Sequence, residues 1–425
     1  MQESQALEKV PQAVLDDAIK KHAMFMRGQV GGRRANFQYK DLSGLDFRGQ
    51  DLSQADFTGS NLQKAELSSC TFKNACFFAS DLRDANMAEG DFSRTDMRGA
   101  CLAGVNLSGS SLKNADMRDG EVMQKKRNTD LTTYKHKDTE GKRTTLSGAR
   151  LGNADLSGIR ADNADFSHAD LSKTNIQNAK LRGASFHGAN LTRADLSGSD
   201  IAYSDMKNAI LADTNFEFTE NYAIDKENAI TDESIGKKIE DTGKTFEELL
   251  DLHKLWIETA GKNGEQLDLS EFDLRNEREL NLVPLTAIKA VKSTFLGLDL
   301  SRANIQSATL DGSDFRDCYM ENADLRGSSL KDVSMTRANL RGARLSPLMF
   351  KNADGTKRIQ RVNFSGADLR FASFRNADLR DTVFMGADLT QADLRETDLR
   401  RADFTGAKLV NTNMDDANLD GTIMD

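Results

Sequence analysis

The sequence predicts an all-β solenoid, a chain wound into coils around its own core, and three observations lead to that fold class. A large apolar residue recurs at every fifth position, as at Leu394, Leu399 and Phe404. A small residue, most often alanine, precedes each of these central residues by two positions. The residues between them are mainly Asp, Asn, Ser and Gly, which accept turn geometry.

A period of five fits neither an α-helix nor a straight strand. Five residues rotate about 140° around a helix and reach the opposite face of a strand. A chain that changes direction every five residues instead aims all central side chains at one axis, where only small neighbours fit, because protein interiors are densely packed. Four blocks with 58 units in total carry this pattern: Phe37 to Val122, Leu146 to Phe216, Phe295 to Phe350, and Phe364 to Met424.

These units resemble the A(D/N)LXX motif of the pentapeptide repeat family, over about two thirds of the chain. The resemblance implies a right-handed quadrilateral β-helix with roughly four units per coil. In such a helix the central residue and the small residue two positions before it point inward. The small inward positions include Cys70 and Cys318, so we expect core cysteines and no disulfide.

Two stretches without the fivefold pattern predict α-helices, each directly before a run of repeats. TFEELLDLHKLWIETAG has a capping box at Thr245 and Glu248 and places His253 and Trp256 three residues apart. LDDAIKKHAMFMRGQVGG repeats that spacing with His22 and Phe25. The histidines suit either ligand or catalytic roles or, as we prefer, hydrogen-bonded positions in helices that cap the exposed first coils.

The chain is therefore expected to be a duplicated helix and β-helix. The predicted domains are a capping helix at 1–36, a first β-helix at 37–222, a linker and second capping helix at 223–268, and a second β-helix at 269–425. The apolar stretch at 279–300, with Pro284, predicts a strained first coil or a short helix rather than a membrane segment. With no apolar amino-terminal signal, a cytoplasmic protein is expected.

Each β-helix contains an insertion that shifts the register, a loop at 123–145 and a shorter loop at 351–361. The first carries seven Lys or Arg against three acids in a chain whose net charge is −9. Such a loop is either simply solvated or a binding surface on a rigid scaffold. In pentapeptide repeat proteins that protect DNA gyrase a projecting loop contributes to the interaction, and by this resemblance the candidate partner-binding residues are Lys125, Lys126, Arg127, Tyr134, Lys135 and Lys137.

The sequence argues against an enzyme. It has no glycine-rich phosphate loop, no HExxH and no GxSxG, and the outward carboxylates recur at intervals without a cavity to shift their pKa values. We expect no metal, cofactor or small-molecule substrate. The preferred hypothesis is a scaffold or adaptor that binds a protein partner, as a monomer or as a dimer through the C-terminal coil.

The alternative is a DNA-mimicking modulator of DNA gyrase or a related type II topoisomerase, the best-known activity in the family. In this chain the acidic residues are largely offset by basic residues one or two positions away, as in ADLRG, which weakens the resemblance to the charge of DNA. Direct binding of nucleic acid is not expected, since the sequence pI is about 5.3 and the aromatic residues are mostly central.

Overall fold

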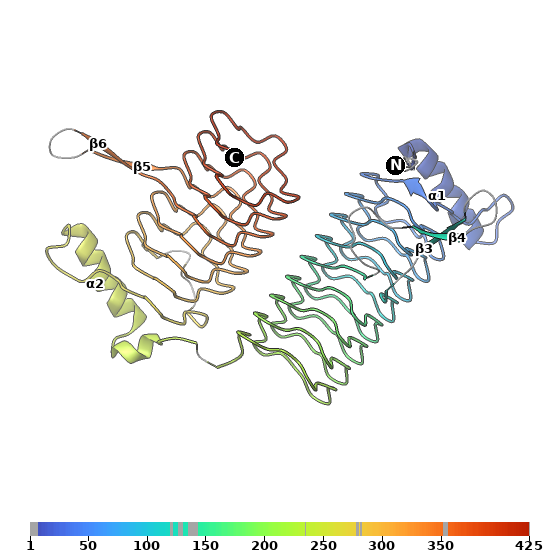
Figure 1. Cartoon of the computed structure of the whole chain (residues 1–425), viewed down its shortest axis with the longest axis horizontal. Helices are drawn as coiled ribbons and strands as arrows, with labels where there is room; N and C mark the ends of the chain where they lie inside the picture. Colours follow the sequence, from blue (N-terminus) through green and yellow to red (C-terminus); the bar gives the residue numbers. More distant parts are fainter. Residues whose placement is uncertain are drawn as a thin grey trace. The chain divides into compact units, whose positions relative to one another are not determined.

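The computed structural model describes residues 7–119, 122–125, 131–134, 143–233, 235–277, 280, 283–351 and 356–424. The chain divides into two compact units, Met1–Glu233 and Ser234–Asp425. Each is a stack of coils that has a helix beside its first coils, α1 (Gln12–Met26) in the first unit and α2 (Phe246–Glu258) in the second (Figure 1). Neither helix has the length and apolar character needed to cross a membrane, within the part of the chain that is described.

The coils are built from parallel bridges between residues 20 positions apart, as from Asp56 to Cys76 and from Cys76 to Asp96. Twenty residues hold four units of five, so each coil has the four sides that the resemblance implies. Backbone hydrogen bonds lock successive coils together, as where the Leu52 amide donates to the Thr71 carbonyl at 2.7 Å. The chain turns two residues after each central residue with a positive φ, 56° at Asn74, which explains why Asn, Asp and Gly are frequent there.

The central and small residues fill two separate hydrophobic cores, one in each unit. Phenylalanines 20 residues apart stack on one another along the axis. The ring centroids of Phe57 and Phe77 are 4.9 Å apart, and those of Phe384 and Phe404 are 4.8 Å apart. Such aromatic pairs contribute about 0.5–1.5 kcal/mol beyond the area that they bury.

Polar residues in the small inward positions satisfy their hydrogen bonds on backbone carbonyls. Ser60 Oγ donates to the Phe57 carbonyl at 2.6 Å, and Cys70 Sγ donates to the Phe47 carbonyl at 2.8 Å. All four cysteines are free, and burial raises the pKa of the Cys70 thiol. Ser204 Oγ, in another of these inward positions, is an exception and is buried without a hydrogen-bond partner.

The first β-helix extends beyond the predicted end at residue 222. Parallel bridges continue from Asp205 to Asp225 and from Ile210 to Ile230. Asn221 and Lys226 occupy central positions of this last coil, so the apolar period ends although the backbone continues to coil. The backbone ladder can continue because it does not depend on the side chains that it carries.

Both insertions contain antiparallel hairpins where the sequence predicted loops. Strand β3 (Val122–Lys125) pairs with β4 (Leu131–Tyr134), and β5 (Leu348–Lys351) pairs with β6 (Lys357–Gln360). In the second unit the coil is continuous across the insertion, because Ser329 bridges Asn363.

Two blocks of the predicted repeat therefore ran one unit too far. Phe350 is not a core residue but lies in β5 and is 43% exposed. Val122 likewise belongs to β3. The last central residues before the insertions are Met117 and Leu345, both fully buried.

The apolar stretch after Glu277 belongs to the first coil of the second unit. Asp268 bridges Lys289 and Asp273 bridges Thr294, a spacing of 21 residues rather than 20. Leu280 and Leu285 are buried in the core of that coil. The coil is irregular in its spacing, as one of the two predicted alternatives expects, and residues 278–279 and 281–282, on which the short helix depends, lie outside the described residues.

Candidate protein-binding surfaces

Each unit begins with the same arrangement, here called the entry module and comprising residues 7–37 in the first unit and 235–269 in the second. A short strand precedes the helix and pairs in parallel with the first coil. In the first unit it is β1 (Glu8–Lys9), which pairs with β2 (Lys40–Asp41). In the second unit Lys237 bridges Phe272, and a 3₁₀ turn, η1 (Ile239–Thr242), leads to α2.

A histidine joins each helix to the chain that enters the first coil. The Nδ1 atom of His22 accepts the Ala35 amide at 3.0 Å, and that of His253 accepts the Leu267 amide at 3.1 Å. Both histidines are fully buried. Because Nδ1 is an acceptor in each pair, the geometry favours the structural alternative for these residues over a ligand or catalytic role.

An aromatic residue and a glycine complete the entry module. His22 stacks on Phe25 with centroids 5.9 Å apart, and His253 stacks on Trp256 at 5.7 Å. A Cβ atom on Gly32 would lie 2.4 Å from the Phe25 amide nitrogen, and one on Gly264 would lie 2.6 Å from that of Trp256. Both glycines therefore allow the chain to pass directly over the helix backbone.

The predicted basic binding residues lie in or beside the first hairpin. The backbones of Lys125 and Tyr134 lie in β3 and β4, where they pair with Leu131 and Val122. Lys126, Arg127, Lys135 and Lys137 lie outside the described residues. Their assignment to a partner remains a prediction.

The second hairpin, β5 and β6, projects from the coils of its unit (Figure 1) and carries exposed apolar side chains. Met349 lies opposite Ile359, and they are 68% and 56% exposed. Gln360 Nε2 donates to the Gly327 carbonyl at 2.5 Å, and Leu348 is the nearest side chain to Gly327. One hairpin face thus contacts the coil while the other presents Met349 and Ile359.

The outer surface carries repeated Asp–Arg pairs in which the arginine follows the aspartate by two residues. In Asp398–Arg400 the guanidinium Nε and Nη2 donate to the two carboxylate oxygens at 2.8 and 2.7 Å, and the Arg400 amide donates to Oδ1. The same fork occurs at Asp46–Arg48, Asp81–Arg83, Asp96–Arg98, Asp116–Arg118, Asp273–Arg275, Asp314–Arg316, Asp324–Arg326, Asp368–Arg370, Asp378–Arg380 and Asp393–Arg395.

The forks at Asp46 and Asp398 stabilise the charged carboxylate. The hydrogen bonds from Arg48 lower the pKa of Asp46 to about 2, and those from Arg400 lower the pKa of Asp398. A carboxyl with a lowered pKa is a poor general acid near neutral pH. The forks also place a guanidinium beside many of the acids that would otherwise imitate DNA phosphates.

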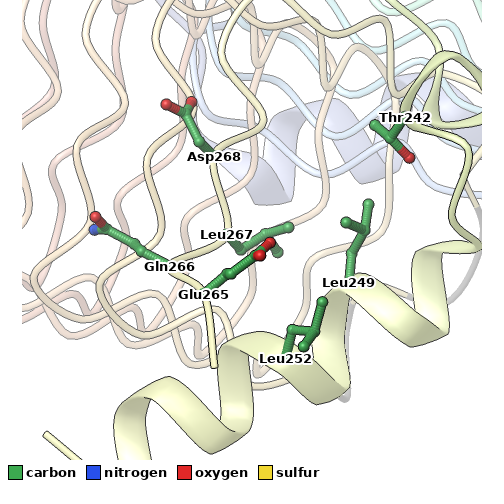
Figure 2. A pocket seen from close by; sticks show the side chains of 7 residues that line it. All are labelled: Thr242, Leu249, Leu252, Glu265, Gln266, Leu267 and Asp268. Atoms are coloured by element: carbon green, nitrogen blue, oxygen red, sulfur yellow. The ribbon is translucent and has the colours of Figure 1, made fainter. Parts of the chain in front are cut away.

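A small pocket lies between α2 and the chain that enters the first coil of the second unit. Figure 2 shows Leu249 and Leu252 of the helix pointing toward Leu267. Its volume is about 180 Å³, below the several hundred Å³ typical of small-molecule sites. Of the acids beside it, Glu265 pairs with Lys244 at 3.2 Å.

An aromatic cluster that the fivefold pattern does not predict lies near the end of the first unit. The Arg182 guanidinium lies 4.8 Å from the ring centroid of Tyr203 and 5.2 Å from that of Tyr222. The two tyrosine rings are 5.1 Å apart. Arg182 and Tyr222 are separated by two coils of 20 residues, so arranging the sequence in rows of 20 would have placed them in one column.

Coils of four five-residue sides around a packed apolar core define a class of β-solenoid. The profile described as Pentapeptide repeats matches more than half of the chain, and the chain belongs to the pentapeptide repeat family. Eight copies match, at residues 41–77, 75–114, 149–188, 189–220, 310–346, 318–354, 363–401 and 397–425.

Several solved structures are similar to the chain. A pentapeptide repeat protein from the Arabidopsis thaliana thylakoid lumen is 30% identical, with a match covering 28% of this chain and 68% of that one and a TM-score of 0.19. HetL, a pentapeptide repeat protein involved in heterocyst differentiation regulation in Nostoc sp. strain PCC 7120, is 19% identical over 95% of this chain and 96% of its own, with a TM-score of 0.15. QnrB1, a plasmid-mediated fluoroquinolone resistance protein, is 19% identical over 53% and 89%, with a TM-score of 0.18. A search of curated proteins gave no match.

Proposed function

We propose that this protein is a non-enzymatic scaffold that binds a protein partner on the outer faces of its two β-helices. The supporting observation is the column arrangement: outward residues 20 positions apart stand directly above one another on coils joined by parallel bridges. Such columns form continuous surfaces held by a packed core. Rigid surfaces bind partners at a low cost in conformational entropy.

We further propose that the entry modules are caps. An open coil presents unpaired backbone groups that invite pairing with another chain, and β1 and Lys237 occupy part of that edge in their units. The packing of Leu15 in the first core and the contact of Leu249 with the second support this role. Each capped unit is then expected to fold as a separate domain.

The scaffold proposal can be tested by chemical crosslinking in a lysate of the native host. The tagged full-length protein should recover one reproducible partner, with crosslinks on lysines of the coil faces such as Lys113 and Lys173. Recovery of no protein above a tag-only control would contradict the proposal. Sedimentation of the purified chain would distinguish a monomer from a dimer through the last coil.

The modulator of DNA gyrase is the second candidate, and the β3–β4 hairpin within a basic insertion is the observation that favours it. The Asp–Arg forks count against DNA mimicry, because they neutralise acids locally. A DNA gyrase supercoiling assay with and without a quinolone tests whether the protein modulates this enzyme. Inhibition or protection that disappears when residues 124–143 are deleted would support it, and no effect of either chain would contradict it.

A further inference from the structure

The last coil of the first unit, residues 211–230, is an open sheet edge. At the start of this coil, the Leu211 amide still donates to the Ile230 carbonyl at 2.7 Å. Among the described residues, the amides of Phe216, Phe218, Asn221 and Ala223 have no such acceptor. These amides form a row to which another strand can be added.

The charges along one side of this edge are unbalanced. Parallel bridges join Lys180 to Asp200 and Asp200 to Glu220, so this column ends in two adjacent acids. The Oδ2 atom of Asp200 lies 3.7 Å from Nη1 of Arg182. Glu220 takes part in no ion pair within the described parts of the chain. A basic residue in the next position of the column would lie beside Glu220 and restore the alternation of charge.

The neighbouring column on the same side ends in an exposed aromatic ring. Tyr222 follows Glu220 by two residues, so both side chains point outward on one face. Tyr222 is 49% exposed, and Phe218 at the preceding corner is 89% exposed. Exposed tyrosines beside an arginine are typical of residues that dominate protein interfaces, and Arg182 lies over Tyr222.

The central position between these two columns is under-filled. Asn221 follows the buried core residues Leu181 and Ile201 in the same column of central positions. Phe216 and Ile224, on the two neighbouring sides, are only partly buried against the core. An apolar side chain placed beneath Asn221 would cover this end of the core.

We propose that an extended segment of a protein partner adds as a parallel strand along residues 219–223, with the order basic, apolar, aromatic or cationic. The basic side chain lies next to Glu220, the apolar one beneath Asn221, and the third against Tyr222. Main-chain hydrogen bonds to the open amides of Asn221 and Ala223 provide affinity, and the three side chains provide specificity. This inference rests on the proposed scaffold function and names the partner chemistry and the surface.

The charge of the edge excludes the other classes of macromolecule as occupants. Residues 213–233 contain seven acids, Asp213, Glu217, Glu220, Asp225, Glu227, Asp232 and Glu233, and one base, Lys226. Arg193 of the preceding coil pairs with Asp213, and Lys207 pairs with Asp225 and Glu227, so the acids still outnumber the nearby bases by seven to three. Nucleic acid phosphates and anionic lipid headgroups would be repelled by this excess of negative charge. A basic peptide segment is the complementary ligand.

The test measures fluorescence anisotropy of a labelled twelve-residue peptide with a central Lys-Leu-Tyr, titrated with the full-length protein. Saturable binding is expected, and a peptide with Glu-Leu-Tyr at the centre should bind at least about tenfold more weakly, because it places like charges together. The Glu220→Lys variant should reverse this preference. Glu89→Lys is the matched control, since Glu89 is an exposed acid on an interior coil, and it should leave both affinities unchanged.

Three results would overturn the inference. They are no saturable binding of the Lys-Leu-Tyr peptide, equal affinity of the wild type for the two peptides, or equal affinity of the wild type and Glu220→Lys for the Lys-Leu-Tyr peptide. A Tyr222→Ser variant provides a second measurement and should weaken binding at least about threefold. If crosslinking in the native lysate recovers a partner while the peptide does not bind, the scaffold function stands and this edge is not its site.

Discussion

The two entry modules contain the same parts joined by chain segments of different length. His22 and His253 both accept an amide of the entering chain, although the amides lie 13 and 14 residues later. The second module adds η1 between its edge strand and helix, and its first coil has one extra residue. The two modules share the contacts that their side chains make with the first coil. The chain segments that connect these contacts differ in length. The two modules therefore share the contacts of an interface rather than a common spacing.

The strongest test of this comparison is whether the two units unfold separately. Phe374 in the second unit and Phe186 in the first are both fully buried; Phe374 contacts Phe384 edge to face, and Phe186 stacks on Phe166. Phe374→Asp is expected to cost more than about 4 kcal/mol, because it buries an unpaired charge and removes a large side chain. Calorimetry of the full chain should then lose the transition of the second unit and keep that of the first.

The reciprocal variant Phe186→Asp should remove the first transition and keep the second. Limited proteolysis assigns each transition, since the unfolded unit is digested while the other persists. Loss of both transitions in either variant would show one cooperative structure and refute the two-domain proposal.

A smaller effect is expected from adding a side chain at the glycine of each module, where the chain passes close to the helix backbone. A Cβ on Gly264 would lie 2.2 Å from the Leu252 carbonyl oxygen, and one on Gly32 would lie 2.6 Å from the Met24 carbonyl carbon. Gly264→Ala and Gly32→Ala should each destabilise their own unit by about 2–4 kcal/mol, because backbone atoms must move. Thermal unfolding measures both changes.

Alanine substitutions at two other glycines measure the cost of backbone strain without a steric clash. Gly44 and Gly297 have φ values of +67° and +70°, and nothing lies within 4 Å of an added Cβ. Their alanine variants should cost only about 1 kcal/mol. If Gly32→Ala proves as mild as Gly44→Ala, the chain does not need to pass so close to α1.

The sequence predicted the coils and the core well because each repeat unit states the same pattern again. The same redundancy misled the prediction at Phe350, since its apolar stretch fits a hairpin strand as well as a repeat unit. The last coil of the first unit was missed because Asn221 and Lys226 break the side-chain pattern while the backbone ladder continues. The Arg182 cluster was missed because its members meet only through a period of 20, which becomes visible once the number of sides per coil is known.

The smallest effect concerns pH and follows from the buried histidines of the two entry modules. Burial lowers the pKa of His22 and of His253, and the carbonyls of Ser53 and Thr286 oppose it only in part. The unfolded chain then takes up protons more readily than the folded one. Stability is therefore complete above the ordinary histidine pKa of about 6.5 and falls as the pH drops below it. One proton limits this slope to about 1.4 kcal/mol per pH unit for each unit of the protein.

Thermal unfolding at pH 7.5 and 5.5 should show both transitions shifting to lower temperature at the lower pH. This window lies above the ordinary pKa values of Asp and Glu, so the carboxylates of the Asp–Arg forks stay charged in both states. His253→Gln should remove the shift from the second unit alone, and His187→Gln, on an outer face, should leave both shifts unchanged. A shift in only one unit of the wild type would show that the two histidines are not equivalent, which would break the comparison at its most specific contact.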